Sequence, residues 1–277
     1  TRSLIVTGVQ TCALPICNIS TVNNLNGVVS IPKPSGLAVG NTMVAHLGSN
    51  GTGVAQTWSP PAGWISLQNS YTASAPSSYS VQTFYKVAVQ ADVDATTFDF
   101  NGSVGGGVQM GTIYYVIGAA GVPSYVVGSV TTNNTVTTTG LTPTANSLLV
   151  IIGSFGDGAA TDTQAGYAIV TSNPTWTERQ DNYYVTTSTY VGHAVATASR
   201  PEATATGTST VVSTPSATTT DVYYQIFIAH APTTAFTMTA SAGSFSLTGL
   251  GATFTFNRPN ILNIAKPTST MINIAKP

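Results

Sequence analysis

The chain has 277 residues, a formal net charge of −1, and charged side chains at only 6% of its positions. Ordinary soluble domains carry about 25% charged residues, and the scarcity of Glu, Lys and Arg argues against long helices. The chain has no basic run and no continuous apolar stretch of about 18 residues, which argues against nucleic-acid binding and against a membrane span.

Residues 1–16 resemble the translation of a primer used for short-read sequencing libraries. Read codon by codon, such a primer gives the run from Val6 to Ile16. We therefore expect this segment to be an adapter-derived artefact of an assembled environmental sequence, to replace the true N-terminus, and to pack poorly. Cys12 and Cys17 then carry no chemistry, which leaves neither a disulfide framework nor a thiolate metal site.

From Val28 onward, strand signals recur about every 8–12 residues between Gly, Pro, Asn and Asp turns. Many of them alternate polar and apolar residues, as Ser80–Val89 does. This pattern predicts an all-β fold, namely a two-sheet antiparallel β-sandwich that is jelly-roll-like. The expected strands of the first half are Val28–Pro32, Thr42–Gly48, Gly63–Gln68, Ser80–Val89, Thr96–Asn101 and Gln109–Ile117. Those of the second half are Tyr125–Thr132, Thr135–Thr139, Ser147–Phe155, Ala168–Thr171, Trp176–Arg179, Val185–Ala196, Ala203–Val212 and Val222–His230.

The two sets of strands resemble each other, as they would after an internal duplication. Three pairs of similar motifs, separated by 105, 112 and 109 residues, contain Asn41 and Asn146, Trp64 and Trp176, and Tyr114 and Tyr223. Two copies are too few for a solenoid. We therefore expect residues 17–232 to form one sandwich domain with pseudo-two-fold symmetry, whose halves span about 28–120 and 121–232.

The composition changes after Pro232. Residues 233–277 begin with short alternating runs that predict strands, and end with two near copies of one heptapeptide, Ile261–Pro267 and Met271–Pro277. We interpret this part as a truncated C-terminal β-repeat segment that is too small to bury a core alone.

The titratable residues do not form a recognisable catalytic or metal-binding motif. His46, His193 and His230 lie in expected strands without metal-ligand spacing, and we interpret them as partly buried strand histidines. A Ser-His-Asp triad is assembled in space and leaves no necessary sequence order, but no Gly-x-Ser-x-Gly elbow of a hydrolase is present. The sequence therefore predicts a protein that is not an enzyme.

Two loops with carboxylates or glycines have structural explanations. Asp92 and Asp94, and Asp157 with Asp162, are expected in loops, where their oxygens could bind calcium. Asx turns explain the same residues. The glycine-rich stretch 102–107 lacks the lysine and the following helix of a phosphate-binding loop. We predict no metal and no cofactor.

Aromatic residues are the best candidates for binding a ligand. Loops at the end of a sandwich commonly present binding surfaces, and a flat aromatic face can stack on a sugar ring. We expect Trp64 and Trp176 to anchor turns in the core. The predicted ligand-binding residues lie in Ser-, Thr- and Asn-rich stretches and are Tyr71, Tyr79, Tyr183 and Tyr184.

A succession of short motifs resembles a domain that is common in structural proteins of tailed phages and prophages. The motifs are KPSG from Lys33, PPAGW from Pro60, FYKVA from Phe84 and TTFDF from Thr96. Asn41 stands where such domains usually have Asp. The resemblance covers roughly 28–232 and rests on structural turns, so it says nothing about a ligand. The stretch 241–249 is similar to short repeats near the C-termini of phage particle proteins.

The resemblance implies a non-enzymatic virion component, carried on a tail, a fibre or a capsid decoration. Its expected location is the virion or the extracellular space. Its expected partners are other virion proteins, further copies of itself and a glycan of the host surface, bound through weak multivalent contacts. A secreted bacterial carbohydrate-binding or adhesion module is the alternative, and a hydrolase with an unrecognised site is a third.

Overall fold

The chain divides into two compact units, one formed by Gln10–Thr234 and the other by Thr1–Val9 with Ala235–Pro277. The computed structural model describes residues of the first unit only. The expectations for residues 1–15 and 233–277 therefore fall outside the described residues. The described residues are 16–24, 27–51, 53–73, 78–104, 107–119, 121–131, 135–157, 164–169, 175–185, 190–200, 203, 206, 209–215 and 222–232.

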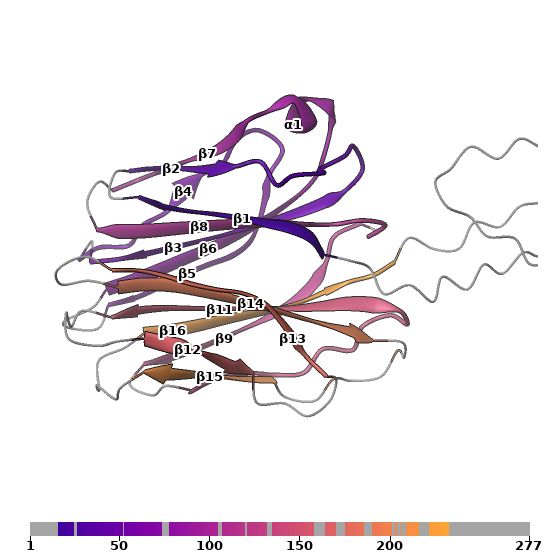
Figure 1. Ribbon diagram of the computed structural model, residues 1–277. Coiled ribbons are helices and arrows are strands. Elements are labelled where there is room, and N and C mark those ends of the chain that lie inside the picture. The colour runs from indigo at the N-terminus through magenta and orange to yellow at the C-terminus, as the bar shows by residue number, and fades with distance from the viewer. Residues whose placement is uncertain are drawn as a thin grey trace, which may run out of the picture. The chain divides into compact units, whose positions relative to one another are not determined.

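Antiparallel strands dominate these residues, and the predicted all-β sandwich is confirmed (Figure 1). The elements of the first half are β1 (Ile16–Asn24), β2 (Val28–Pro32), β3 (Thr42–Asn50), β4 (Trp58–Ser59), β5 (Ile65–Ala73), β6 (Ser78–Val87), α1 (Gln90–Asp94), β7 (Thr97–Gly102) and β8 (Val108–Val116). Those of the second half are β9 (Ser124–Thr131), β10 (Thr135–Thr138), β11 (Ser147–Asp157), β12 (Gln164–Ile169), β13 (Thr177–Val185), β14 (Tyr190–Arg200), β15 (Ser209–Pro215) and β16 (Val222–His230).

The two halves have the same strand order. The first half forms a five-stranded sheet, β1-β8-β3-β6-β5, and a three-stranded sheet, β2-β7-β4. The second half forms β9-β16-β11-β14-β13 and β10-β15-β12, which is the same arrangement with every strand number raised by eight. Strands β1-β8-β3-β6 opposite β2-β7-β4 follow the order of a jelly roll. Each half is therefore jelly-roll-like, and the predicted internal duplication is present in the topology.

The sheets form four layers (Figure 1). The two five-stranded sheets pack face to face, and their shared core takes Val44 and Tyr114 from the first half and Val150 and Ile226 from the second. Each three-stranded sheet covers the outer face of the five-stranded sheet of its own half. The predicted two-sheet sandwich corresponds to the central pair, to which each half contributes one sheet.

Contacts between the central sheets are reciprocal. Strand β3 packs on β11, while β6 packs on β11 and β16, and β14 packs on β3 and β8 in return. Exchanging the halves maps the β3–β11 contact onto itself and converts each of the others into another member of the same set. Such reciprocity is the mark of an interface that has two-fold symmetry, and it supports the pseudo-two-fold relation that the sequence predicted.

The strands at the centre are buried on both faces. All nine residues of β3 and all nine of β8 are buried. Because side chains alternate along a strand, Met43 packs on the outer sheet of its half while Val44 packs on the second half. The outer strand β2 instead alternates exposed and buried residues, which is the pattern of a sheet with one face in solvent.

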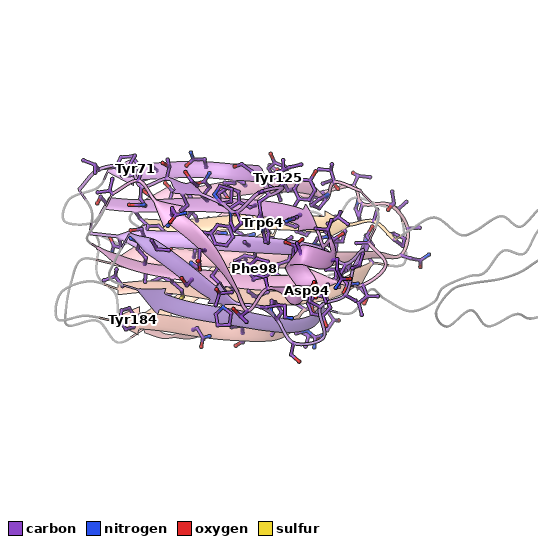
Figure 2. The ribbon with its side chains drawn as sticks, turned by 90° about the horizontal axis from the view of Figure 1, so that it is seen from above. Trp64, Tyr71, Asp94, Phe98, Tyr125 and Tyr184 are labelled. Atoms are coloured by element: carbon purple, nitrogen blue, oxygen red, sulfur yellow. The ribbon has the colours of Figure 1, made fainter. Side chains whose placement is uncertain are left out.

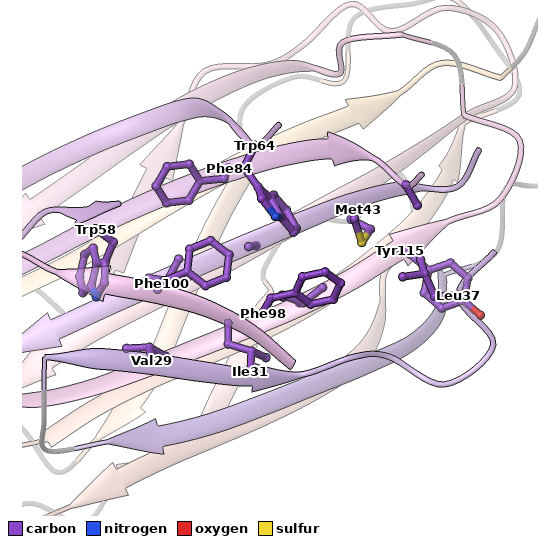
Figure 3. Close-up of a cluster of buried hydrophobic side chains, with 14 residues drawn as sticks. Val29, Ile31, Leu37, Met43, Trp58, Trp64, Phe84, Phe98, Phe100 and Tyr115 are labelled. Carbon is purple, nitrogen blue, oxygen red and sulfur yellow. The ribbon is translucent and has the colours of Figure 1, made fainter. Parts of the chain in front are cut away.

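Trp64 anchors the core of the first half, as the sequence predicted (Figure 3). Its ring lies edge-on to Phe98 and Phe100, with centroid distances of 5.8 and 5.5 Å. Trp176 immediately precedes β13, as Trp64 precedes β5, and contacts Phe227 edge-on at 5.8 Å. The two tryptophans thus have equivalent places in the two halves.

The helix α1 replaces the loop that we expected around Asp92 and Asp94, so that prediction was wrong. The backbone N–H of Val89 donates to the Asp92 carboxylate at 2.9 Å, which caps the first turn. Five residues are too few to show a helical hydrophobic period. The edge strand β1, which pairs with β8, was not expected either.

Replacing Ile152 tests whether the two halves share one core. Ile152 is fully buried between the central sheets, so Ile152→Ala is expected to lower the free energy of unfolding by about 2–5 kcal/mol. The matched variant Ile117→Ala changes a side chain that is 45% exposed and is expected to cost less than about 1 kcal/mol. Denaturant unfolding followed by circular dichroism measures both, and the expected transition is single. Separate transitions, with only one shifted, would contradict a shared core.

Candidate functional site

Central strands of both halves end at the same end of the sandwich, which we call the loop end (Figure 1). In the first half, β3 finishes at Asn50, which pairs with Tyr79 near the start of β6 and with Val108 at the start of β8. In the second half, a Cβ on Gly156 near the end of β11 would lie 3.0 Å from Cγ of Asn50. The ends of β3 and β11 therefore meet at this end of the sandwich.

Tyr79 lies inside the sandwich at the loop end and is 0% exposed. Its ring packs with the ring of Tyr224 at a centroid distance of 5.8 Å, among buried Val and Met side chains of both halves. Burial raises the pKa of the Tyr79 hydroxyl far above its usual range. The structure thus places Tyr79 in the core and not on a surface where its ring could stack on a sugar.

Tyr71 and Tyr184 lie nearer the surface of the loop end (Figure 2). Both belong to strands and not to the loops that we expected, since β5 and β13 continue through polar residues beyond their apolar parts. The Tyr71 hydroxyl donates to the carbonyl of Gly53 at 3.4 Å. Tyr184 is partly buried against the cluster that contains Tyr79.

The structure does not bring the four predicted tyrosines into one patch. Tyr71 lies on β5 and Tyr184 on β13, which are edge strands of different sheets, and Figure 2 shows them at opposite sides of the loop end. Tyr183 pairs with Gly192 through its backbone, but its side chain lies outside the described residues.

Tyr224 belongs to the same buried cluster as Tyr79 and was not singled out from the sequence. Its ring is 3% exposed, and its hydroxyl is hydrogen-bonded to the Thr72 hydroxyl, which joins β16 of one half to β5 of the other. Burial raises the pKa of Tyr224, and the bond to Thr72 opposes that shift. The sequence does indicate the burial of Tyr224, because the alternation along Val222–His230 puts it on the same face as the apolar Ile226.

A band of polar side chains, which we call the polar seam, crosses the buried interface between the central sheets. On the first sheet, Thr83, His46 and Thr112 are neighbours in register on adjacent strands. On the second sheet, His193 and Ser154 are neighbours in register. All five are buried, and apolar clusters lie on both sides of the band.

The imidazoles of the seam are held by threonine hydroxyls. Nδ1 of His46 lies 2.7 Å from Oγ1 of Thr83, in the same sheet. Nδ1 of His193 lies 3.1 Å from Oγ1 of Thr112, in the opposite sheet. The two rings meet edge-on, with their centroids 4.8 Å apart. A third imidazole, His230, pairs across the sheets with the Tyr114 hydroxyl at 3.0 Å.

Burial keeps these three imidazoles neutral at physiological pH. Loss of solvation lowers the pKa of His46 and of His230 to about 3. The pKa of His193 is lowered well below its usual value by burial and, to a smaller degree, by the neighbouring His46. The sequence predicts all three in strands as partly buried residues, and the structure shows that they are completely enclosed.

Asp92, one of the calcium candidates, is already engaged by protein donors. One carboxylate oxygen lies 2.6 Å from Nζ of Lys86 in a largely buried ion pair, and the other accepts the N–H of Val89. Lys86 also donates to the carbonyl of Ala62 at 2.8 Å, which fixes the PPAGW turn. This arrangement gives the carboxylate a structural role.

Within the described part of the chain, no three His, Cys, Asp or Glu side chains are grouped to hold a metal ion. The described residues also include no helix that is long and apolar enough to cross a membrane. Comparisons with known protein families, with curated proteins and with solved structures found no match to this chain.

Acid is expected to destabilise the fold through the three buried histidines. Their folded pKa values lie below the unfolded value of 6.5, so below that pH the unfolded chain binds protons that the folded chain does not. The contribution of the neutral histidines to the free energy of unfolding is therefore fully present above about pH 7 and is lost as the pH falls toward 3. Between pH 7 and 5 the expected loss is about 2 kcal/mol per histidine.

Urea unfolding at a series of pH values measures this loss. Histidine is the side chain whose ordinary pKa puts its change of charge in this range, so the slope between pH 7 and 5 reports the three histidines. The variant His230→Gln is expected to reduce that slope by about one third, since one of three sites is removed. A free energy of unfolding that stays constant from pH 7 to 5 would refute this account of the buried imidazoles.

Proposed function

We propose that this protein is a non-enzymatic structural or attachment component of a phage virion, which presents its loop end to a host-surface glycan. The observation that carries the proposal is the duplicated fold. Two jelly-roll-like halves share one core and bring the ends of β3 and β11 together at one end of the sandwich. A rigid scaffold with adaptable loops at one end is a common arrangement for binding proteins.

The chemistry of the described residues supports a binding role more than a catalytic one. The three histidines of the chain are enclosed between the central sheets, where a surface substrate has no access to them. The buried Asp92 carboxylate is paired with Lys86. The low content of charged residues leaves hydroxyl and amide groups for the surface, and these exchange hydrogen bonds with sugar hydroxyls.

Tyr71 and Tyr184 are the tyrosines best placed for such a ligand. Each combines an apolar ring with a polar tip at the loop end. Because they lie on opposite edges, they belong to two separate contacts and not to one deep pocket. Shallow contacts of this kind bind weakly one at a time, and many copies on a virion raise the overall affinity.

Tyrosine variants of the full chain test the proposed attachment. Tyr71→Ala and Tyr184→Ala are each expected to weaken binding to host cells, or to positive features of a glycan array, by about 10-fold, equivalent to about 1.4 kcal/mol. The matched control is Tyr125→Ala on β9, since Tyr125 is 39% exposed and lies away from the loop end in Figure 2. Binding that is unchanged in both loop-end variants would eliminate these two contacts.

The genes beside the coding sequence discriminate the virion role from the alternative of a secreted bacterial carbohydrate-binding or adhesion module. Tail or capsid genes on the same contig are expected for a virion component. Genes for secretion or polysaccharide use would favour the adhesion module instead.

A further inference from the structure

Four polar atoms of the interface between the central sheets are buried without a hydrogen bond of normal geometry. They are Nε2 of His46, Nε2 of His193, the Tyr79 hydroxyl and the Ser154 hydroxyl. Nearly all buried polar atoms in proteins are hydrogen-bonded, either to protein groups or to ordered water. The two Nε2 atoms, beside two hydroxyls that satisfy each other incompletely, therefore point to a bound molecule.

The four atoms are close neighbours. Gly48 follows His46 by two residues on β3, so both positions face the second sheet. A Cβ on Gly48 would overlap the Tyr79 hydroxyl and would lie 2.8 Å from Nε2 of His193. A hydrogen-bonding interaction with the Ser154 side chain opposes the rise in the Tyr79 pKa, so these two hydroxyls are neighbours. The absence of a side chain at Gly48 thus lets these polar groups approach the strand closely.

The hydrogen bonds of His46 show which kind of partner its Nε2 atom requires. Thr83 donates its hydroxyl hydrogen to Oε1 of Gln68, so its oxygen is left to accept from Nδ1–H of His46. Nε2 of His46 is then unprotonated and requires a donor. The hydroxyls of Tyr79 and Ser154 can each donate or accept. A water molecule, with two donor and two acceptor sites, fits this combination of neutral groups.

We propose that the polar seam and the adjoining Tyr79 form an internal hydration site. In this site, ordered water bridges Nε2 of His46, Nε2 of His193 and the hydroxyls of Tyr79 and Ser154. Internal waters typically make about three hydrogen bonds to buried polar groups, and the seam offers four. The water completes a hydrogen-bonded connection between the two halves at the centre of an otherwise apolar interface. His230 needs no such water, because the Tyr114 hydroxyl satisfies its Nε2 directly.

A high-resolution crystal structure of the full chain near pH 7 tests this site directly. The expected result is an electron-density peak of water size within hydrogen-bonding distance of at least two of the four atoms. No such peak is expected between His230 and Tyr114. A direct hydrogen bond between Tyr79 and His193 without such a peak would overturn the proposal. A peak with an anomalous metal signal would do the same, since it would identify a metal site.

Oxygen-17 magnetic relaxation dispersion counts long-lived internal waters in solution and allows a variant to be compared. Gly48→Ala places a methyl group in the site and is expected to remove at least one such water. The matched control is Gly111→Ala on β8, where the new Cβ would meet Ile31 at 2.6 Å in the core of the first half and not in the seam. An equal water count in wild type and Gly48→Ala would count against the site. If Gly48→Ala does not fold, the wild-type density remains decisive.

Discussion

Face-to-face packing of the two five-stranded sheets is the contact on which the remaining structure depends. It buries the second face of strands whose first face is already covered by a three-stranded sheet, so that β3 and β8 are buried from end to end. Antiparallel sheets more often keep one face in solvent and show a clean alternation. Here β3 and β8 are buried on both faces, and the burial of Val44 and Val150 in one core holds the halves together.

Complete burial also restricts which polar side chains the interface can contain. A polar group removed from water costs free energy unless it is hydrogen-bonded, and the seam satisfies each imidazole at Nδ1 with a threonine hydroxyl. The hydrogen bond between His193 and Thr112 joins the two sheets. It therefore stabilises one particular placement of the halves relative to each other. Apolar packing alone is less specific about register than such directional bonds. The polar seam therefore helps to fix how the two halves meet.

Much of the fold was predictable because its signals are local. Turn residues and strand periodicity located most strands, and Asn41 and Asn146 precede equivalent strands, β3 and β11. The equivalence of Tyr114 and Tyr223 did not hold. Met43 and Leu148 are equivalent, since each stands two residues after one of these asparagines. Met43 pairs with Tyr115 of β8 and Leu148 pairs with His230 of β16, so equivalent residues of β8 and β16 lie 115 and not 109 residues apart. Similar dipeptides in two strands do not establish register, which depends on the partner strand.

The outer sheets and the burial of Tyr79 were not predictable, since both depend on contacts that are distant in sequence. The stretch around Tyr79 is as rich in Ser as a surface loop, yet it continues a strand that is covered on both sides. Tyr71 shows how the same physics shapes the loop end. The neighbouring Thr72 is hydrogen-bonded to Tyr224 of the other half, and this hydrogen bond holds the edge strand that carries Tyr71. A ring that is held by its neighbours loses less conformational entropy on binding, so the packing of the halves also prepares the surface that we propose contacts the host.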